Sequence, residues 1–242
     1  MNNIELIGLC GVGKTSLTNS LIERDKKIKY PNRIEVFFYR LYYASNIIFK
    51  NNLNFTIFFR KDIRFLISNL AYRYLLLNKN HLMIEEGCFV DKNIFQIFIT
   101  YKTIFNSKDS EIQNLSKFLI NNHSLPNILL YLKNDNINET YKNFLKRENN
   151  LNRTEFWGDE KNLKTRYFSS LKVINYIKEL CVELNIKFET IDVNENYKKK
   201  ASDFFINYYN ILNQNNIEID REEKNINFDK FHLEIINNQQ VK

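Results

Sequence analysis

The sequence has few of the residues that cross-link or interrupt a chain, since its 242 residues include only three cysteines and two prolines. The cysteines, at positions 10, 88 and 181, are odd in number and widely spaced, with no C-x-x-C pair. This pattern indicates neither a disulfide framework nor a zinc site. It fits a reducing compartment, so we expect a cytoplasmic protein.

Long hydrophobic runs and an N-terminal leader are also missing. Apolar stretches such as residues 65–77 are broken by polar side chains, and none reaches the roughly twenty residues needed to span a bilayer. The sequence begins almost directly on a predicted strand, so no secretion signal is expected. These absences predict a soluble or at most peripheral protein without a transmembrane segment.

The charge is basic but not clustered. Lys and Arg number 35 against 28 Asp and Glu, which gives a formal net charge of +7. The longest basic run, residues 198–200, is typical of a solvated helix start. Such a distribution suits small anionic ligands, and no nucleic-acid binding is expected. The length fits one α/β domain, and a homodimer is left open.

One sharp motif is present, G-x-x-x-x-G-K-T at residues 8–15, directly after the apolar run 4–7. Such a loop curls around a nucleotide phosphate with its backbone N–H groups pointing inward, and glycines are needed where a Cβ would collide with the phosphate. Lys14 is expected to lie along the β- and γ-phosphates, and Thr15 to offer its hydroxyl to Mg²⁺. The predicted cofactor-binding residues here are Gly8, Cys10, Gly11, Val12, Gly13, Lys14, Thr15 and Ser16.

Apolar runs of strand length alternate with longer helical patterns, which is typical of a parallel sheet covered by helices. Strands are predicted at residues 4–7, 34–38, 82–85, 128–132 and 188–191. Helices are predicted at 14–23, within 39–78, at 91–105, 110–121 and 138–146, in a long segment before the fifth strand, and at 201–212. The domain is therefore expected to cover residues 1–212, and 213–242 to form a helical or partly disordered extension.

Acidic residues close the third predicted strand, which ends in Glu85 and Glu86, with Asp91 a few residues later. In an open parallel sheet, functional side chains follow the carboxyl ends of strands, so these acids are expected beside the phosphate loop. One carboxylate would serve Mg²⁺ while its neighbour orients the acceptor or takes its proton. Adjacent strand residues point to opposite faces, and the sequence does not decide whether Glu85 or Glu86 faces the metal.

Three arginines, Arg147, Arg153 and Arg166, flank a polar stretch, residues 147–159, that has no apolar period and is predicted to form a mobile lid. Phosphoryl transfer spreads negative charge over the oxygens of the moving group, and arginines on a closing flap can neutralise that charge. We expect at least one of Arg147 and Arg153 to reach the phosphates.

The segment 36–77 is rich in aromatic and basic residues. Helical spacing buries about half of these aromatics in a core. The others favour an acceptor pocket, in which a ring stacks and Arg60, Arg64 or Arg73 meets a phosphate or carboxylate of the acceptor.

Taken in order, these features resemble the P-loop nucleoside and nucleotide kinase superfamily, and its deoxynucleoside and thymidylate kinase branch in particular, over about residues 1–210. The resemblance implies a three-layer α/β fold with a five-stranded parallel sheet, a central loop strand, bound ATP and Mg²⁺, and an arginine-bearing lid. It implies that Glu35 receives the proton of the acceptor hydroxyl. It also implies that Asp192, Val193 and Asn194 border the adenine.

The sequence departs from this family at the third strand. Deoxynucleoside kinases have Glu-Arg-Ser there and thymidylate kinases Asp-Arg, whereas Glu86 is followed here by Gly87 and Cys88. The arginine that would contact the acceptor is missing, which favours a divergent small-molecule kinase on the same scaffold.

The sequence thus predicts an ATP-dependent phosphotransferase that acts on a hydroxyl or phosphate of a nucleoside, nucleotide or related metabolite, with Glu35 or Glu86 positioning the acceptor. The alternative is a P-loop NTPase that works as a regulatory switch or an ATP-binding module. A guanine switch needs Asp-x-x-Gly, which the sequence lacks, and Asn-Lys-x-Asp, whose nearest match at residues 132–135 has no first Asn.

Overall fold

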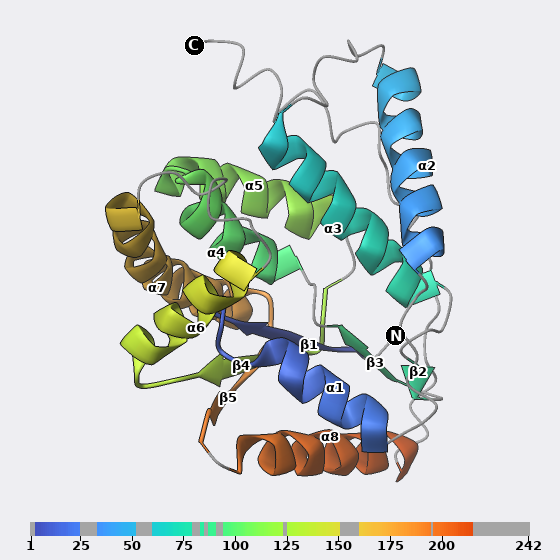
Figure 1. Ribbon diagram of the computed structural model, residues 1–242. Coiled ribbons are helices and arrows are strands. Elements are labelled where there is room, and N and C mark those ends of the chain that lie inside the picture. The colour runs from blue at the N-terminus through green and yellow to red at the C-terminus, as the bar shows by residue number, and fades with distance from the viewer. Residues whose placement is uncertain are drawn as a thin grey trace.

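A sheet with the strand of the phosphate-loop motif at its centre organises the fold (Figure 1). The computed structural model describes residues 3–24, 33–51, 60–78, 83–84, 87–90, 94–122, 125–150, 160–194 and 196–214. Its strands are β1 (Asn3–Gly8), β2 (Met83–Ile84), β3 (Gly87–Val90), β4 (Ile128–Lys133) and β5 (Lys187–Asp192). They lie in the order β2-β3-β1-β4-β5.

The sheet is mixed, and not parallel throughout as expected. β1 pairs parallel with β3 and β4, and β4 pairs parallel with β5, but β2 pairs antiparallel with β3. The third predicted strand, 82–85, is therefore displaced, because the strand that pairs with β1 on this side is Gly87–Val90. Only two residues separate β2 from β3, too few for the crossover that a parallel pair requires.

The predicted second strand, residues 34–38, is also wrong, because these residues belong to helix α2 (Arg33–Asn51). Its large apolar side chains recur every three or four residues, which is the helical period, and this period continues well beyond the short run that suggested a strand. The strand preference of residues 34–38 depends on their surroundings, and the helical period of the longer segment prevails over it. Glu35 consequently lies in the first turn of a helix and not on a strand.

The remaining helices are α1 (Lys14–Arg24), α3 (Lys61–Asn78), α4 (Ile94–Phe105), α5 (Asp109–Asn122), α6 (Ile137–Asn150), α7 (Glu160–Glu183) and α8 (Tyr197–Gln214). Most lie where the sequence predicted them. α6 runs to residue 150, so the first residues of the predicted lid are helical, whereas 151–159 lie outside the described residues. The predicted extension also lies outside them beyond residue 214.

Helices cover both faces of the sheet and produce three layers (Figure 1). On one face, α3, α4, α5 and α7 share a core with Ile7 of β1 and Leu129 of β4. On the other face, α1 and α8 pack on Leu6 and Leu130. Neighbouring residues of a strand point to opposite faces, so β1 contributes to both cores. This arrangement buries β1 in the middle of the sheet, and the phosphate loop begins at its carboxyl end.

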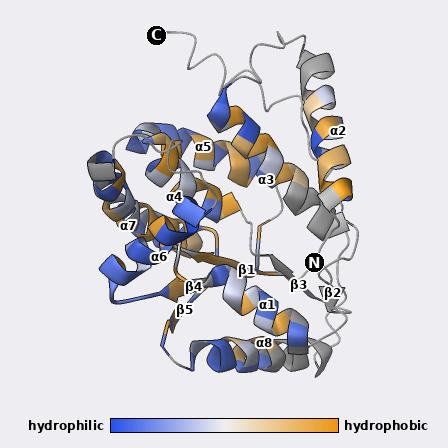
Figure 2. Cartoon of the chain, in the orientation of Figure 1, coloured by the Kyte–Doolittle hydropathy of each residue, from blue (hydrophilic) through white to orange (hydrophobic). Residues whose placement is uncertain are grey.

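The most apolar helix, α4, is a core element, and Figure 2 shows its hydrophobic character together with that of β1. Phe95 and Phe98 are fully buried and meet edge to face at 5.8 Å between ring centroids. In the described ranges, no helix is both long and apolar enough to cross a membrane.

Candidate functional site

The phosphate-loop motif forms a tight connection between β1 and α1 whose shape requires glycine at two positions. Gly11 and Gly13 have φ angles of +89° and +103°, a region that side chains disfavour. A Cβ on Gly11 would lie 2.4 Å from the carbonyl oxygen of Thr140 and 2.7 Å from the backbone nitrogen of Phe144. A Cβ on Gly13 would lie 2.8 Å from the hydroxyl oxygen of Tyr197. The loop therefore fits closely between α6 and α8.

Lys14 is held over the loop that it follows. Its Nζ donates hydrogen bonds to the carbonyl oxygens of Gly8 at 2.7 Å and Leu9 at 3.0 Å. α1 begins at Lys14, so its first N–H groups and its positive dipole end lie at the loop. Thr15 and Ser16 are exposed in the same turn. The arrangement places an ammonium group and the N-terminal end of a helix at the loop, and their binding of a phosphate stays a prediction of the motif.

A cluster of aromatic side chains from α6 and α7 holds the loop at Cys10. Tyr167 of α7 is fully buried, and its hydroxyl donates to the carbonyl oxygen of Cys10 at 2.5 Å. Its ring stacks on Phe144 with 5.6 Å between centroids and lies 5.0 Å from that of Tyr141. Burial raises the pKa of Tyr167 far above its usual value, so the hydroxyl keeps its proton and remains a donor.

Arg147, in the last turn of α6, lies beside the same part of the loop. Its guanidinium carbon is 5.6 Å from the centroid of the Phe144 ring, and the Cys10 side chain is a neighbour. Burial works to lower the pKa of Arg147, but Cys10 and the carboxylate of Glu148 outweigh it and raise the pKa above its usual value. A permanent positive charge therefore lies next to the phosphate loop.

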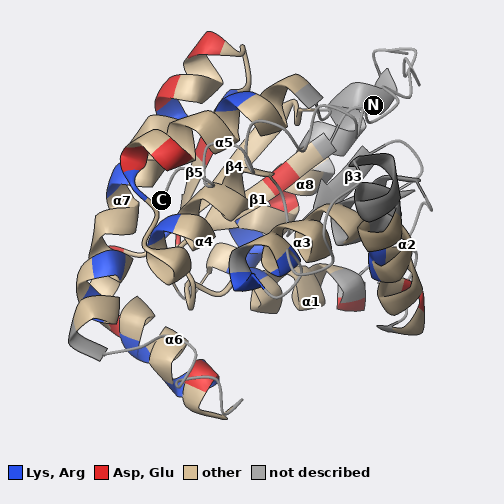
Figure 3. Ribbon diagram, turned by 90° about the horizontal axis from the view of Figure 1, so that it is seen from above, with Lys and Arg blue, Asp and Glu red and all other residues tan. Residues whose placement is uncertain are grey.

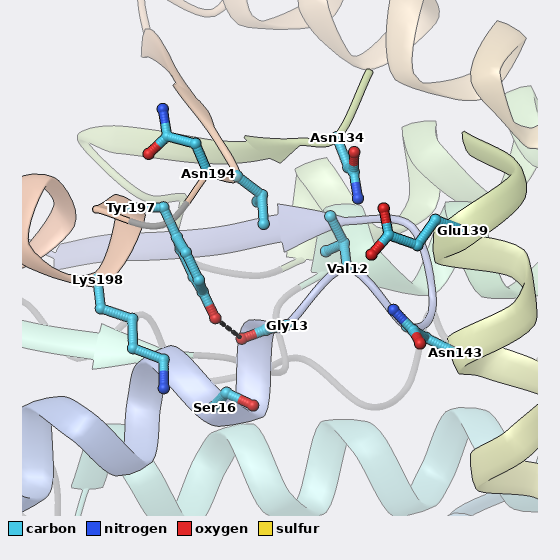
Figure 4. Close-up of a pocket in the computed structure, with 11 residues that line it drawn as sticks. Val12, Gly13, Ser16, Asn134, Glu139, Asn143, Asn194, Tyr197 and Lys198 are labelled. Carbon is cyan, nitrogen blue, oxygen red and sulfur yellow. Dashed lines mark hydrogen bonds between the residues drawn. The ribbon is translucent and has the colours of Figure 1, made fainter. Parts of the chain in front are cut away.

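A pocket of about 670 Å³ opens over the loop, within the size range of small-molecule sites (Figure 4). Figure 4 shows Tyr197 reaching toward Gly13 from one side, and Glu139 and Asn143 of α6 lying on the other. The loop contributes Gly11, Val12 and Gly13, and α1 contributes Ser16; the other lining residues are Asn134, Glu139, Asn143, Val193, Asn194, Tyr197 and Lys198. Chain segments that are far apart in sequence thus meet at the carboxyl ends of β1, β4 and β5.

The structure brings some of the predicted adenine-side residues to this pocket. Val193 and Asn194 line it, and the backbone nitrogen of Val193 donates to the carbonyl oxygen of Lys133 at 2.7 Å. Asp192, the last residue of β5, is exposed and is not among the lining residues.

The predicted acceptor-side residues lie elsewhere or outside the described part of the chain. Arg60 precedes α3 and is half-buried, and Arg64 is exposed in its first turn. Neither they nor Glu35 lines the pocket at the loop. The remaining predicted positions are outside what the structure describes: Glu85, Glu86 and Arg153 entirely, and Arg73 for its side chain.

Sequence reasoning missed several pocket residues, of which Asn134 is the clearest. It follows β4 directly, and its Oδ1 accepts a hydrogen bond from the backbone nitrogen of Asn136 at 2.8 Å. Asn194 makes the same kind of turn after β5, accepting from Asn196 at 3.1 Å. The rule that functional side chains follow strand ends would have selected Asn134, but nothing local in the sequence marks Glu139, Asn143 or Tyr197.

No protein-family model and no curated protein matches the sequence. Among solved structures, the chain is similar to a deoxyadenosine kinase from M. mycoides with bound dATP, with a TM-score of 0.47, 16% identity, and coverage of 86% of this chain and 99% of that one. Two further structures of a deoxyadenosine kinase from M. mycoides, one with the products dCMP and dCDP and one with dCTP, have TM-scores of 0.46 and 0.48. Their identities are 18% and 15%, with the same coverage of 86% and 99%.

Proposed function

We propose that this protein is an ATP-dependent phosphotransferase, a divergent relative of the deoxynucleoside kinases, that moves the γ-phosphoryl group of ATP to a small-molecule acceptor. The observation that carries the proposal is the phosphate loop, with Lys14 folded over it and a pocket of nucleotide size opening at its outer side. Arg147 adds a fixed positive charge beside the loop. These are the groups that stabilise charge on phosphoryl oxygens.

In this proposal, Lys14 and the loop amides hold the β- and γ-phosphates. Thr15 fits a Mg²⁺ role, because its exposed side chain lies in the first turn of α1 next to Lys14. Either Glu85 or Glu86 would complete that set, and a bound Mg²⁺ would neutralise charge on the phosphates. Val193 and Asn194 would border the adenine, together with Asp192 at the end of β5.

The acceptor would be a nucleoside, a nucleotide or a related metabolite. Its hydroxyl oxygen, or a phosphate oxygen, attacks the γ-phosphorus, and the bond from that phosphorus to the bridging oxygen breaks to release ADP. With a hydroxyl acceptor, Glu35 or Glu86 takes the proton. The arginines at 60, 64 and 73 would bind an anionic part of the acceptor. Arg153 would close over the phosphates, and Arg147 would contact them from its place beside the loop.

The proposal is tested with purified protein, ATP, Mg²⁺ and a panel of nucleosides, nucleotides and sugars. A melting screen in the presence of ATP first selects acceptors, because a bound acceptor stabilises the folded state by mass action. ADP release is then measured with and without each selected compound. We expect at least one compound to stimulate ADP formation.

Lys14→Ala should reduce that acceptor-stimulated rate by about 100-fold or more, since it removes a charge that acts on the transferred group. Lys178→Ala, on the exposed side of α7, is the matched control and should leave the rate unchanged. Stimulated turnover that survives Lys14→Ala, or ATP turnover that no acceptor changes, would reject the proposed function.

A further inference from the structure

The buried face of α6 includes an acidic residue, Glu148, at a position where the spacing of its buried residues predicts an apolar side chain. Thr140, Phe144 and Glu148 follow one another at four-residue spacing and are all buried. Residues four apart lie on the same face of a helix, so Glu148 continues the face that Phe144 presents to the core. Only 2% of Glu148 is exposed. A carboxylate at such a position needs a specific partner, because burying a charge without one is costly.

One such partner is Arg147. Its Nε donates to Oε1 of Glu148 at 2.8 Å, and its Nη2 lies 2.7 Å from the same oxygen. The Arg147 side chain is about half exposed, so the pair joins a buried anchor to a cation that solvent and ligands can reach. The guanidinium is also bounded by the Phe144 ring and by Cys10 of the phosphate loop.

Arginine is normally a flexible side chain, and holding it in one place costs rotamer entropy. Here the carboxylate, the ring and the loop confine the guanidinium before any ligand arrives. A guanidinium has five N–H donors, so a group held through Nε and Nη2 can still donate to an oxyanion. The contact between Gly11 and the backbone of α6 keeps the helix that carries the pair against the loop.

We propose that Glu148 is a positioning residue, which acts through Arg147 by fixing its guanidinium beside the phosphate loop for the γ-phosphoryl group. This inference rests on the proposed function, and it adds a residue that has no part in the mechanism above. Pre-organised donors of this kind are effective because they need no rearrangement when charge develops on the moving group.

A purely structural role for the pair predicts a different result. If the ion pair only stabilised α6, removing Glu148 would lower stability and weaken all nucleotides alike. Replacing both members of a buried ion pair with apolar residues is often neutral or stabilising, whereas removing one member is destabilising, so comparing Glu148→Met with the double variant Arg147→Met and Glu148→Met probes that role. Glu148→Gln keeps the shape of the side chain and removes only its charge.

The experiment measures ATP and ADP dissociation constants, kcat and melting temperature for Glu148→Gln, Glu148→Met, Arg147→Met and the double variant Arg147→Met with Glu148→Met. Glu179→Gln, exposed on α7, is the control. ADP lacks the γ-phosphate, so we expect Glu148→Gln and Glu148→Met to weaken ATP about 10-fold, leave ADP affinity unchanged and lower kcat. In the Arg147→Met background, Glu148→Met should cause no further loss, because the arginine through which it acts is gone.

Equal losses of ATP and ADP affinity that follow the melting temperature would overturn the positioning role. So would a loss in the Arg147→Met background as large as that in the wild-type chain. If Glu148→Met does not fold, the isosteric Glu148→Gln tests the positioning role through the same comparison, the loss of ATP affinity relative to the loss of ADP affinity. A wild-type protein without acceptor-dependent turnover would reject the proposed function, whereas the ratio of ATP to ADP affinity would still test Glu148 separately.

Discussion

Gly11 shows how a single residue couples the phosphate loop to the helix beside it. Its φ of +89° suits glycine, and its α-carbon faces the backbone of α6 so closely that no side chain fits. Tyr167 holds the neighbouring residue of the loop through the Cys10 carbonyl oxygen. The loop conformation is therefore set by contacts from residues more than a hundred positions away, as well as by its own glycines.

Gly11→Ala should consequently destabilise the protein and weaken ATP binding. The backbone conformation alone costs on the order of 1–3 kcal/mol for a side chain, and displacing α6 adds to it. We expect the free energy of unfolding, measured by urea denaturation, to fall by about 2 kcal/mol or more. Lys142→Ala, on the exposed side of α6, is the control. Equal unfolding free energies for Gly11→Ala and the wild-type protein would contradict the close contact.

Cys181 gives a pH prediction at the same scale. It is fully buried, and burial raises the pKa of its thiol to about 12 from an ordinary value near 9. A raised folded-state pKa means that the stabilisation is complete below pH 9 and is lost as pH rises toward 12. The loss is on the order of 1.4 kcal/mol per pH unit.

Thermal melting from pH 8 to 11 should therefore show a steeper alkaline decline for the wild-type protein than for Cys181→Ala. Cys181→Ala also leaves a cavity that lowers stability at every pH, so the comparison uses the slope of melting temperature against pH and not the melting temperature itself. Val182→Ala, at an exposed neighbouring position, should keep the wild-type slope. Identical slopes for Cys181→Ala and the wild-type protein would show that the thiol does not titrate as described.

At the scale of elements, α2 and α4 use similar residues in opposite ways. α4 buries Phe95 and Phe98 in the core, whereas α2 exposes Phe37 and Phe38 to 56% and 61%. Burial, and not residue type, decides how much an aromatic side chain stabilises the fold.

Phe98→Ala in α4 should lower the free energy of unfolding by about 3–5 kcal/mol, since it opens a cavity in a packed core. Phe38→Ala in α2 removes the same atoms from an exposed position and should change it by about 0.5 kcal/mol or less. Chemical denaturation of both variants checks the pair. A loss for Phe38→Ala as large as that for Phe98→Ala would mean that α2 is covered in solution.

The same elements show how far the sequence could predict the fold and the site. The loop, β1, α1 and the later helices have local signals, namely glycine spacing, a helix start and sustained apolar periods. Residues 34–38 were misassigned because five residues carry too little of the helical period to outweigh their strand preference. The hairpin of β2 and β3 was missed because strand pairing is a long-range property. Long-range contacts also bring Tyr167, Tyr197 and Glu148 to the site, so the sequence did not predict their roles. Glu148 does carry a local signal, because it is an acidic residue four positions after Phe144 on the same helix face.

At the scale of the whole molecule, the site lies at the carboxyl ends of the parallel strands, between the helices that cover the two faces of the sheet. Parallel strands bring their carboxyl ends to one edge, so α1, α6 and α8 converge on the phosphate loop from different layers. Figure 3 shows basic residues interleaved with acidic ones along α6 and α7. Among the described residues, the positive charges at the phosphate loop and its pocket come from Lys14, Arg147 and Lys198.

The most direct test of the central claim follows the γ-phosphoryl group itself. ATP labelled at the γ-phosphate is incubated with the protein, Mg²⁺ and the acceptors selected by melting, and the label is located by chromatography. The account predicts label on the acceptor, in equal amount to the ADP formed, and loss of that product with Lys14→Ala. Label released only as inorganic phosphate, at a rate that no acceptor changes, would contradict it.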